Sequence, residues 1–429
     1  MSRLRPMTQI EVPDYDLGLR GKLVRSNKTN SGMAFCTIAY GLSLVDDTSD
    51  TPFSNAENGY PDGVVVADEA TRVELPWRQG TDAVIADFVD ADGRPFGPSA
   101  RGVLLGLIDE YRSLDLEPVL GYEYEVWIFR ETPGAEFHGT SGLTPLGRTH
   151  NAYSLTRSVE ADELASEYID RMTHVGIEVE AFHSELGPGF FEFALAPAPA
   201  KEAADGAARA RQYLRDLCAE HGLRASFMAK PFGGFSGAGG HVHSSLVRDG
   251  ANVMVDEPGR FSDVGSRYLA GLLQTMTDFT VLFSPYVNSF KRADPAMFVG
   301  DRAFWGSDDR NATCRALLGS TKAARIEHRR PGADANPYVV AAALLAGGLV
   351  GLQDQLPLPE AGPVGAKALP DNLGDAITAL ENSGYAAQTL GKAFVEAFAS
   401  TRRAEHQRYE AWMRTFITPW ELQRHLEHQ

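Results

Sequence analysis

Cysteine is scarce in this chain, and the cysteines present are not placed for a disulfide framework. The 429 residues include three, Cys36, Cys218 and Cys314, which lie far apart and in no metal-binding spacing. An odd and scattered set of this kind is typical of a reduced, cytoplasmic protein. We therefore expect a cytoplasmic protein that folds without disulfide bonds.

Long apolar runs are also missing. No stretch reaches the roughly 18 uninterrupted apolar residues of a membrane span. The longest candidate, residues 339–352, is rich in alanine, glycine and leucine, and we expect it to form a buried helix. Residues 1–20 mix charge with proline, so no signal peptide is expected. Nothing in this pattern indicates a membrane partner.

Basic residues are outnumbered. The chain has 40 lysines and arginines against 57 aspartates and glutamates, for a net charge of −17. Such a balance disfavours nucleic acid and anionic membranes as partners. An acidic enzyme can still bind an anionic nucleotide where metal ions and local arginines reverse the field. The composition, 43% hydrophobic and 23% charged, is ordinary for a globular protein of about two domains.

The order of expected elements favours an α+β fold. Residues 1–30 are polar and expected to be partly disordered. Strands are expected at residues 34–38, 63–67, 83–88, 121–129, 177–184, 190–194, 225–228, 240–246 and 325–329. Helices are expected at residues 101–114, 160–174, 203–221, 267–282, 337–352, 373–381 and 405–416. Several strands follow one another without a helix, which favours an antiparallel sheet flanked by helices. A Pro/Gly/Asp-rich linker at 90–99 divides the chain into domains at 1–98 and 99–429.

Two glutamates share one face of the strand at residues 121–129. Strand side chains alternate between faces, so Glu123 and Glu125 point the same way, roughly 7 Å apart. Paired carboxylates on an otherwise apolar strand are costly unless a positive group lies between them. Alone, the pair fits a solvated strand face equally well.

A second acidic element follows at residues 183–193. Glycine and proline form a turn between two strands, and each side of the turn carries a glutamate, Glu185 and Glu192. Such a hairpin can bring both carboxylates to one site, although two exposed hairpin charges explain the pattern as well.

A glycine-rich loop leads into a histidine pair. Residues 233–240 contain five glycines, so a ligand can approach the backbone closely. His241 and His243 follow directly and share a strand face. Further along, Arg325, Glu327 and Arg329 lie on one side of another strand. Five carboxylates and an imidazole from these segments suit two hard divalent cations better than zinc, and neighbouring arginines are what phosphoryl transfer requires.

Six motifs, in this order, resemble the glutamine synthetase family over roughly residues 60–380. They are GYEYEVWIF, HSELGPGFFEF, FMAKPFGGFSGAGGHVHSSL, SPYVNSFKR, RNATCR and KAARIEHRRPGADANPY. The resemblance implies a β-grasp N-terminal domain, a catalytic domain, and active sites between subunits of a homo-oligomer, typically a dodecamer of two hexameric rings. It also implies ATP-dependent chemistry, in which glutamate becomes γ-glutamyl phosphate and an amine displaces the phosphate.

The resemblance further implies a metal-binding and a catalytic role for matching residues. Two or three Mg²⁺ or Mn²⁺ ions would be bound, one anchoring glutamate and one on the ATP phosphates. The glutamate-side ligands would be Glu125, Glu185 and Glu192, and the nucleotide-side ligands Glu123, His241 and Glu327. The transferring phosphoryl group would be stabilised by Arg310, Arg315 and Arg325.

Substrate contacts follow from the same resemblance. Glutamate would be bound by Gly237, Arg292 and Arg329, with Arg329 forming a bidentate pair with a carboxylate. The nucleotide would be contacted by Glu180, His243, Ser245 and Lys322. Trp305 lies near this group in sequence, but we expect it to pack in the core.

The chain departs from the family where the amine should enter. Family members that use ammonia carry a flap glutamate six residues after the arginine matched by Arg292, and that position is Phe298 here. The asparagine expected before Gly237 is Ser236. The N-terminal aspartate that holds ammonium has three candidates, Asp46, Asp50 and Asp62. The tyrosine adenylylated in some bacterial relatives aligns with Gly374, so that control is expected to be absent.

Replacing a carboxylate by phenylalanine removes the counter-charge for ammonium and adds apolar surface, worth about 25 cal/mol per Å² buried. An alkylammonium, like lysine with a pKa near ~10.4, must lose a proton before attack, whereas an aryl amine is already neutral. We therefore predict an ATP-dependent γ-glutamyl-amide ligase in which Phe298 favours a hydrophobic alkyl or aryl amine.

Four alternatives stay open. Asp294 or Asp301 can replace the flap carboxylate, which gives an ammonia-dependent glutamine synthetase. The amine can be a polyamine or methylamine. The protein can be a non-catalytic regulator, although six intact metal ligands argue against that. Finally, Ser236 leaves open an acid other than glutamate, while Arg292 and Arg329 favour an α-carboxylate.

Overall fold

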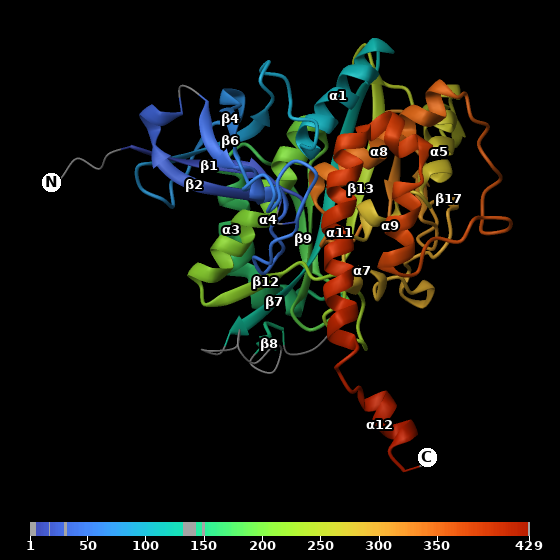
Figure 1. The fold of residues 1–429 in the computed structure, drawn as a ribbon. Helices are drawn as coiled ribbons and strands as arrows, with labels where there is room; N and C mark the ends of the chain where they lie inside the picture. The colour runs from blue at the N-terminus through green and yellow to red at the C-terminus, as the bar shows by residue number, and fades with distance from the viewer. Residues whose placement is uncertain (1–5, 17, 30–31, 132–142, 148–150, 428–429) are drawn as a thin grey trace.

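The computed structural model describes residues 6–16, 18–29, 32–131, 143–147 and 151–427. Within these ranges the chain forms two β-sheets of unequal size and a set of helices that pack mainly against the larger one (Figure 1). The smaller sheet is built from the first 89 residues and the larger from residue 117 onward. The α+β class predicted from the sequence is therefore confirmed.

The small sheet has six strands in the order β2-β1-β6-β4-β3, with β5 paired to β6. Its strands are β1 (Met7–Pro13), β2 (Leu19–Arg25), β3 (Met33–Cys36), β4 (Asp62–Ala67), β5 (Val73–Glu74) and β6 (Thr81–Val89). The central pair β1 and β6 is parallel, and its neighbours are antiparallel. The interpretation of residues 1–30 as a partly disordered polar segment missed β1 and β2, because sheet pairing, not local composition, orders them.

The large sheet has eleven strands, with β17-β18-β19-β13-β7-β10-β9 as its main path. Its strands are β7 (Glu117–Glu131), β8 (Leu143–Pro145), β9 (Val179–Ser184), β10 (Phe190–Leu195), β11 (Ala198–Pro199), β12 (Leu223–Ser226), β13 (Gly240–Arg248), β14 (Ala251–Asn252), β17 (Trp305–Ser307), β18 (Cys314–Leu317) and β19 (Arg325–His328). Strand β7 pairs with five others and runs through the middle. Strands β15 (Val255–Glu257) and β16 (Arg260–Phe261) pair separately. The antiparallel expectation holds for every pair except β17 with β18.

The helices are α1 (Ala100–Ser113), α2 (Leu155–Ser158), α3 (Asp162–His174), α4 (Ala200–Glu220), α5 (Asp263–Thr275), α6 (Thr280–Phe283), α7 (Val287–Phe290), α8 (Pro337–Gln353), α9 (Leu373–Glu381), α10 (Gly384–Ala386), α11 (Lys392–Met413) and α12 (Pro419–His425). The helix expected at 267–282 is two helices, α5 and α6. The helix expected at 405–416 is the end of α11; the first half of α11, which buries Phe394, Val395 and Phe398, was missed.

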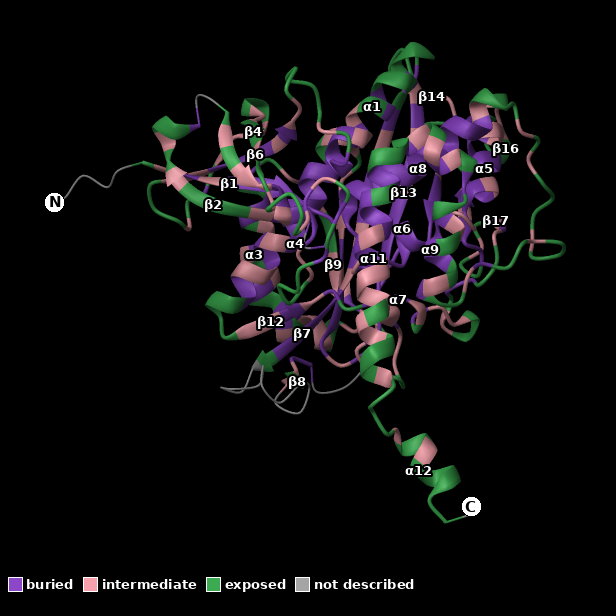
Figure 2. Ribbon diagram, viewed as in Figure 1, coloured by how far each residue is buried: buried purple, intermediate pink, exposed green. Residues whose placement is uncertain are grey.

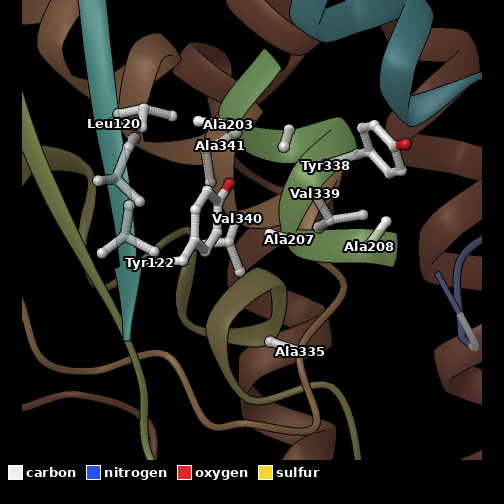
Figure 3. Close-up of a cluster of buried hydrophobic side chains, with 14 of the residues drawn as sticks. Leu120, Tyr122, Ala203, Ala207, Ala208, Ala335, Tyr338, Val339, Val340 and Ala341 are labelled. Atoms are coloured by element: carbon white, nitrogen blue, oxygen red, sulfur yellow. The ribbon is translucent and has the colours of Figure 1, made fainter. Parts of the chain in front are cut away.

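Helix α8 is the centre of the core. It is apolar on every side, and all but its last residues are buried, which is the pattern of a fully enclosed helix. Asn336 caps its first turn by accepting N–H bonds from Tyr338 and Val339, and Pro337 follows at the first helical position. Small alanines on α4 and α8 let the two helices approach β7 closely, as Figure 3 shows for Leu120 and Tyr122.

Buried ion pairs join the small sheet to helix α4. Glu11 of β1 accepts from Arg209 at 2.8 Å and from the Tyr213 hydroxyl at 2.9 Å, and all three side chains are buried. Arg101 of α1 contacts Asp205 of α4 in the same way, at 2.8 Å. Breaking one partner of such a pair leaves an uncompensated buried charge. The two sheets are therefore held in a fixed relation through α4.

Helix α11 lies across the front of the molecule, and α12 projects away from its end (Figures 1 and 2). The residues of α12 are exposed or half-buried. Among the residues that the structure describes, no helix combines the length and apolarity needed to cross a bilayer.

Candidate active site

The pairing register of the large sheet gathers acidic side chains on one face. Glu125 of β7 lies directly opposite Glu192 of β10, and Glu192 lies opposite His183 of β9. On the other side of β7, Glu123 lies opposite His241 of β13. Opposed residues in an antiparallel sheet share a face, so strands up to 118 residues apart in sequence supply one acidic row.

The row continues through β13 into β19 and β18. His243 lies opposite Glu327, and Glu327 lies opposite Arg315. The other face of β7 carries Tyr122 and Tyr124, which are buried in the core. The period-two alternation predicted for this strand thus separates a charged face from an apolar one.

Glu123, His241 and Glu327 form a first cluster, in which one potential ligand atom of each lies within 4.8 Å of the others. The His241 Nδ1 atom is 3.7 Å from the Glu123 carboxylate and 3.5 Å from that of Glu327. Burial and the nearby charge of Arg329 lower the pKa of His241. A neutral imidazole keeps a lone pair that can bind a metal ion. Burial works to raise the pKa of Glu123, yet contacts with His241 and His243 hold it well below its usual range.

His183, Glu185 and Glu192 form a second cluster that meets the same distance limit. The His183 Nε2 atom is 3.0 Å from the Glu192 carboxylate. Burial and the charges of Glu125 and Glu192 raise the pKa of Glu185 to about 7. That repulsion between carboxylates is relieved by a cation. His183 was not predicted, although it lies two residues before Glu185, and its Nδ1 atom is 3.6 Å from that carboxylate. Its register against Glu192 also brings it here.

Arginines border the first cluster. Arg315 contacts the Glu327 carboxylate at 2.9 Å, and Arg329 contacts the other oxygen of Glu327. The Arg329 Nε atom also donates to the Arg310 carbonyl at 3.1 Å. Arg325 donates from Nε to His243 Nδ1 at 3.0 Å. The predicted phosphoryl-stabilising arginines are therefore close to the predicted nucleotide-side ligands.

The glycine loop packs against Arg292. A Cβ atom on Gly237 would lie 2.6 Å from Arg292 Cγ and 2.7 Å from the Ala229 carbonyl oxygen, so this close approach requires glycine. The backbone N–H of Gly239 donates to Glu125 at 2.7 Å. The buried Arg292 guanidinium donates to the carbonyls of Arg330 and Arg329, at 2.9 and 3.2 Å. Arg292 thus ties the loop to the end of β19, and its proposed contact with glutamate stays a prediction.

Many of these groups line one cavity of about 470 Å³, although His183, His243 and Arg325 lie outside its lining. Carboxylates, His241 and arginines line it together with Tyr153 and the apolar residues Leu186, Phe190, Met297, Phe298 and Val299. Of these apolar residues, only Phe298 was predicted. Tyr153 lies over His183, with ring centroids 4.8 Å apart, a contact across 30 residues that no sequence period indicates.

Phe298 belongs to a short flap between Arg292 and Gly300. It ends a single turn of 3₁₀ helix at Pro295–Met297 and has a left-handed backbone, with φ of 60°. That conformation is uncommon for a bulky residue. The ring lines the cavity while 48% of the residue stays exposed. Asp294 accepts the Ala296 N–H at 3.0 Å as a helix cap, and Asp301 is exposed. Neither lines the cavity among the described residues, so the structure offers no support for either as a substitute flap carboxylate.

Several predicted contacts lie outside this cavity. Ser245 follows His243 along the same face of β13, and Lys322 is exposed in the turn before β19. Glu180 is exposed, two residues before Phe182, whose ring packs against Tyr168. The structure does not bring Glu180 to the acidic row. The nucleotide roles of these three stay predictions.

Two further groups are placed away from the cavity. Trp305 packs against Phe261 with ring centroids 5.6 Å apart, in agreement with a packing role. The candidate ammonium ligands Asp46, Asp50 and Asp62 do not line the cavity within this chain. Asp50 accepts bonds from the Ala56 N–H and the Tyr60 hydroxyl within its own loop.

Comparison with known families and structures gives a consistent result. The family described as "Glutamine synthetase, catalytic domain" matches residues 98–425. Type-1 glutamine synthetase 2 of Dictyostelium discoideum is 31% identical over 442 residues, covering 98% of this chain and 84% of the relative. Glutamate–isopropylamine ligase of a Pseudomonas species is 31% identical over 433 residues, covering 96% and 93%.

A solved structure of the same architecture is described as GmaS in complex with ADP. It superposes with a TM-score of 0.84 at 27% identity, covering 98% of this chain and 97% of that one. The similarity therefore includes the small N-terminal sheet as well as the large sheet that carries the acidic row.

Proposed function

The chain belongs to the glutamine synthetase family, and on that premise we propose that it joins glutamate to an organic amine, at the expense of ATP, to form a γ-glutamyl amide. A hydrophobic alkyl or aryl amine is the favoured substrate. The observation that carries this proposal is that one cavity is lined both by carboxylates and arginines and by apolar flap residues that include Phe298.

The donor set fits divalent cations. Oxygen ligands dominate both clusters, with one imidazole in each, and hard cations such as Mg²⁺ and Mn²⁺ prefer such sets. Glu123, His241 and Glu327 would hold the ion on the nucleotide side, and Glu125, Glu185 and Glu192 would hold the other, with His183 beside them. Bound ions would neutralise phosphate charge and polarise the glutamate carboxylate. The glutamine synthetase family generally uses ATP and divalent metals; two or three ions of Mg²⁺ or Mn²⁺ are proposed here.

The reaction divides into two steps. The glutamate γ-carboxylate attacks the terminal phosphorus of ATP, releasing ADP and leaving γ-glutamyl phosphate. Arg310, Arg315 and Arg325 are proposed to balance the charge of the moving phosphoryl group, as guanidinium groups do in phosphoryl transfer. Gly237, Arg292 and Arg329 are proposed to hold glutamate, while His243, Ser245, Lys322 and Glu180 are proposed nucleotide contacts.

In the second step the amine nitrogen attacks the γ-carbonyl carbon, phosphate leaves, and one amine proton is lost. Phe298, with Met297 and Val299 beside it on the flap, offers apolar surface to the alkyl or aryl group but no carboxylate to a small ammonium ion. Burial of an amine's carbon skeleton is worth about 25 cal/mol per Å². Ammonium has no carbon skeleton to bury and would lose hydrating water on binding. The flap therefore favours an organic amine over ammonium.

The same premise leads to a proposed organisation. A β-grasp domain at residues 1–98 and a catalytic domain at 99–429 are supported by a small sheet that ends before the 90–99 linker. A cytoplasmic homo-oligomer, a dodecamer of two hexameric rings, would supply the N-terminal aspartate of one subunit to the cavity of the next. Asp46, Asp50 and Asp62 lie outside this chain's own cavity, as such sharing requires.

The proposal is tested by phosphate release from ATP and glutamate with ammonia, methylamine, isopropylamine, putrescine and aniline as nucleophiles. We expect kcat/KM for isopropylamine or aniline to exceed that for ammonia by at least about tenfold, the equivalent of about 1.4 kcal/mol. A highest value for ammonia would remove the role given to Phe298. No amine-dependent phosphate release with any nucleophile would favour the non-catalytic alternative.

A further inference from the structure

A second cavity, of about 840 Å³, shares no lining residue with the catalytic one. Its lining comes from the loop carrying Leu44 and Val45, helix α4, strand β12, helix α7 and helix α11. Helices α4, α7 and α11 are labelled in Figure 1. None of the residues assigned above to metal, nucleotide or glutamate lines it. Its volume lies in the range of ordinary small-molecule sites.

Basic side chains meet in this cavity. Arg211 and Arg215 lie one turn apart on α4, Arg224 comes from β12, and Lys291 follows α7 at the exposed rim. Like charges four residues apart on a helix repel each other. In a chain with a net charge of −17, such a concentration of positive charge is not a consequence of composition.

The two arginines of α4 are not neutralised by ion pairs. Arg211 is buried, with one nitrogen donating to the Ala335 carbonyl at 2.7 Å and with no partner for Nε. Arg215 lies over the Phe227 ring at 4.9 Å. Neither has a carboxylate within 4.0 Å among the residues that the structure describes. Burial and the charge of Arg211 lower the pKa of Arg215 to about 9. Arg211 is fully buried and Arg215 is half-buried. A buried cation without an ionic partner is costly, and a bound anion would offset that cost.

The acidic groups of the cavity are largely engaged elsewhere. Asp16 is paired with the buried Arg402. Asp334 accepts the Ser289 hydroxyl at 2.5 Å, and burial raises the pKa of its carboxyl to about 6. Glu405 of α11 is the remaining acidic residue among those that line the cavity.

We propose that this cavity binds a compact anion bearing carboxylate or phosphate groups, at a site separate from the catalytic cavity. Guanidinium groups match both oxyanions by bidentate hydrogen bonding. Arg211 and Arg215 would hold the anion at the inner end, and Lys291 would close the outer end. The Tyr286 hydroxyl, which also lines the cavity and has no partner, adds a neutral donor.

The test is calorimetric titration of the metal-free, full-length protein with inorganic phosphate and, separately, succinate, at constant ionic strength. Saturable binding of either anion is expected, and the arm that binds more tightly identifies phosphate or carboxylate as the recognised group. Arg215→Met is expected to weaken that binding at least tenfold. Lys291→Met, on the exposed rim, is expected to weaken it severalfold while leaving the fold intact.

Two matched control variants distinguish anion binding at this site from anion binding elsewhere on the protein. Arg310→Met alters the catalytic cavity and is expected to leave the affinity unchanged. Lys392→Met removes an exposed charge outside both cavities and is expected to do the same. Binding that survives both Arg215→Met and Lys291→Met, binding lost in Arg310→Met, or no saturable binding of either anion would each overturn the proposal.

A second measurement is thermal unfolding, with and without added anion. Because the half-buried Arg215 lies beside the like charge of Arg211, Arg215→Met is expected to leave the melting temperature in anion-free buffer unchanged or raised. Wild-type protein is expected to gain stability from the tighter-binding anion, and Arg215→Met to gain none. A variant that is less stable without anion, with an undiminished response to it, contradicts the inference.

Discussion

The catalytic cavity has two sides that differ in how they are built. On the carboxylate side, Glu123, Glu125, Glu192 and Glu327 stand on neighbouring strands whose hydrogen bonds fix their spacing. On the flap side, Phe298 stands on a loop with a single 3₁₀ turn and remains half exposed. Sites on strands are held more rigidly than sites on loops, so we expect the first side to determine whether a reaction occurs and the second to determine which amine reacts.

The strand side and the flap side also differ in charge. The strand side concentrates carboxylates: burial, and then the charges of Glu125 and Glu192, raise the pKa of Glu185 to about 7, and a bound cation would relieve this repulsion. The flap side is nearly uncharged and needs only a ligand of matching shape and polarity. A substitution on the strand side should therefore affect all nucleophiles equally, and a substitution on the flap should change their ranking.

The largest effect is expected for Glu327→Gln. The carboxylate is buried and contacts Arg315, Arg329 and His241, so the amide keeps the size but removes the charge that all three groups face. Loss of such an electrostatic centre costs at least about 10²–10³ in kcat. Phosphate release should fall by this factor with every amine, leaving their ranking unchanged.

The matched control for that variant is Glu257→Gln, an exposed glutamate paired only with Arg260. Its activity is expected to stay within about twofold of wild type, because exposed pairs are worth at most about 1 kcal/mol. Melting curves should show that both variants are folded. Wild-type turnover by folded Glu327→Gln protein would remove the strand side from the mechanism.

The strand side was largely predictable from the sequence, because a period of two is the same in every strand. Glu123 with Glu125, and Arg325 with Glu327 and Arg329, needed only that alternation. Tyr153 was not predictable in this way, since its position depends on a loop that returns to β9. His183 was missed although it has the same two-residue spacing from Glu185; its contact with Glu192 depends on the register between β9 and β10. Strand register is set by tertiary packing, which no local pattern contains.

The same distinction explains the errors in the fold. Strand β2 was missed because it is an edge strand of mostly polar residues that pairs with β1, whereas β1 was missed although it is largely buried between β2 and β6. The flap was located from Phe298 alone, but its 3₁₀ turn and left-handed backbone were not. Helices α8 and α9 were predicted almost to the residue, since the Asn-Pro start of one and the apolar period of the other are local signals.

The second prediction concerns a substitution that changes the flap residue from apolar to acidic. Phe298→Glu restores a carboxylate at the position where ammonia-using relatives carry one, and it removes the apolar ring. The ratio of kcat/KM for isopropylamine to that for ammonia is expected to fall by about 10- to 100-fold, the effect of removing about 1.5–3 kcal/mol of apolar contact. The measurement is phosphate release with both nucleophiles in competition-free assays.

Phe298→Leu is the control, because it keeps an apolar side chain without a charge. Its ratio is expected to move by less than about tenfold. If Glu and Leu at this position change the ratio equally, the charge of the flap is irrelevant and only ring size matters.

The third prediction concerns pH. Without a flap base, an alkylamine must react as the small neutral fraction of a cation with a pKa near ~10.4. Its kcat/KM, expressed per total amine, should rise about tenfold from pH 7 to 8, because the neutral fraction rises tenfold. For aniline, which is already neutral, the same interval should change kcat/KM little. A flat profile for the alkylamine would reveal a base that the described residues do not present.

The smallest effect concerns the carboxylates of the strand side and is measured as thermal stability. Mg²⁺ is expected to stabilise the protein against thermal unfolding by about 2.7 kcal/mol at one hundred times its Kd, because it binds only the folded clusters. Glu185→Gln removes one carboxylate from the repelling set, so the metal-free variant should melt at or slightly above the wild-type temperature while gaining less from Mg²⁺. Phe298→Leu, on the flap, should gain as much as wild type. If Mg²⁺ raised the melting temperature equally in all three proteins, the ion would bind elsewhere. The strand side and the flap side would then not differ in their need for a cation.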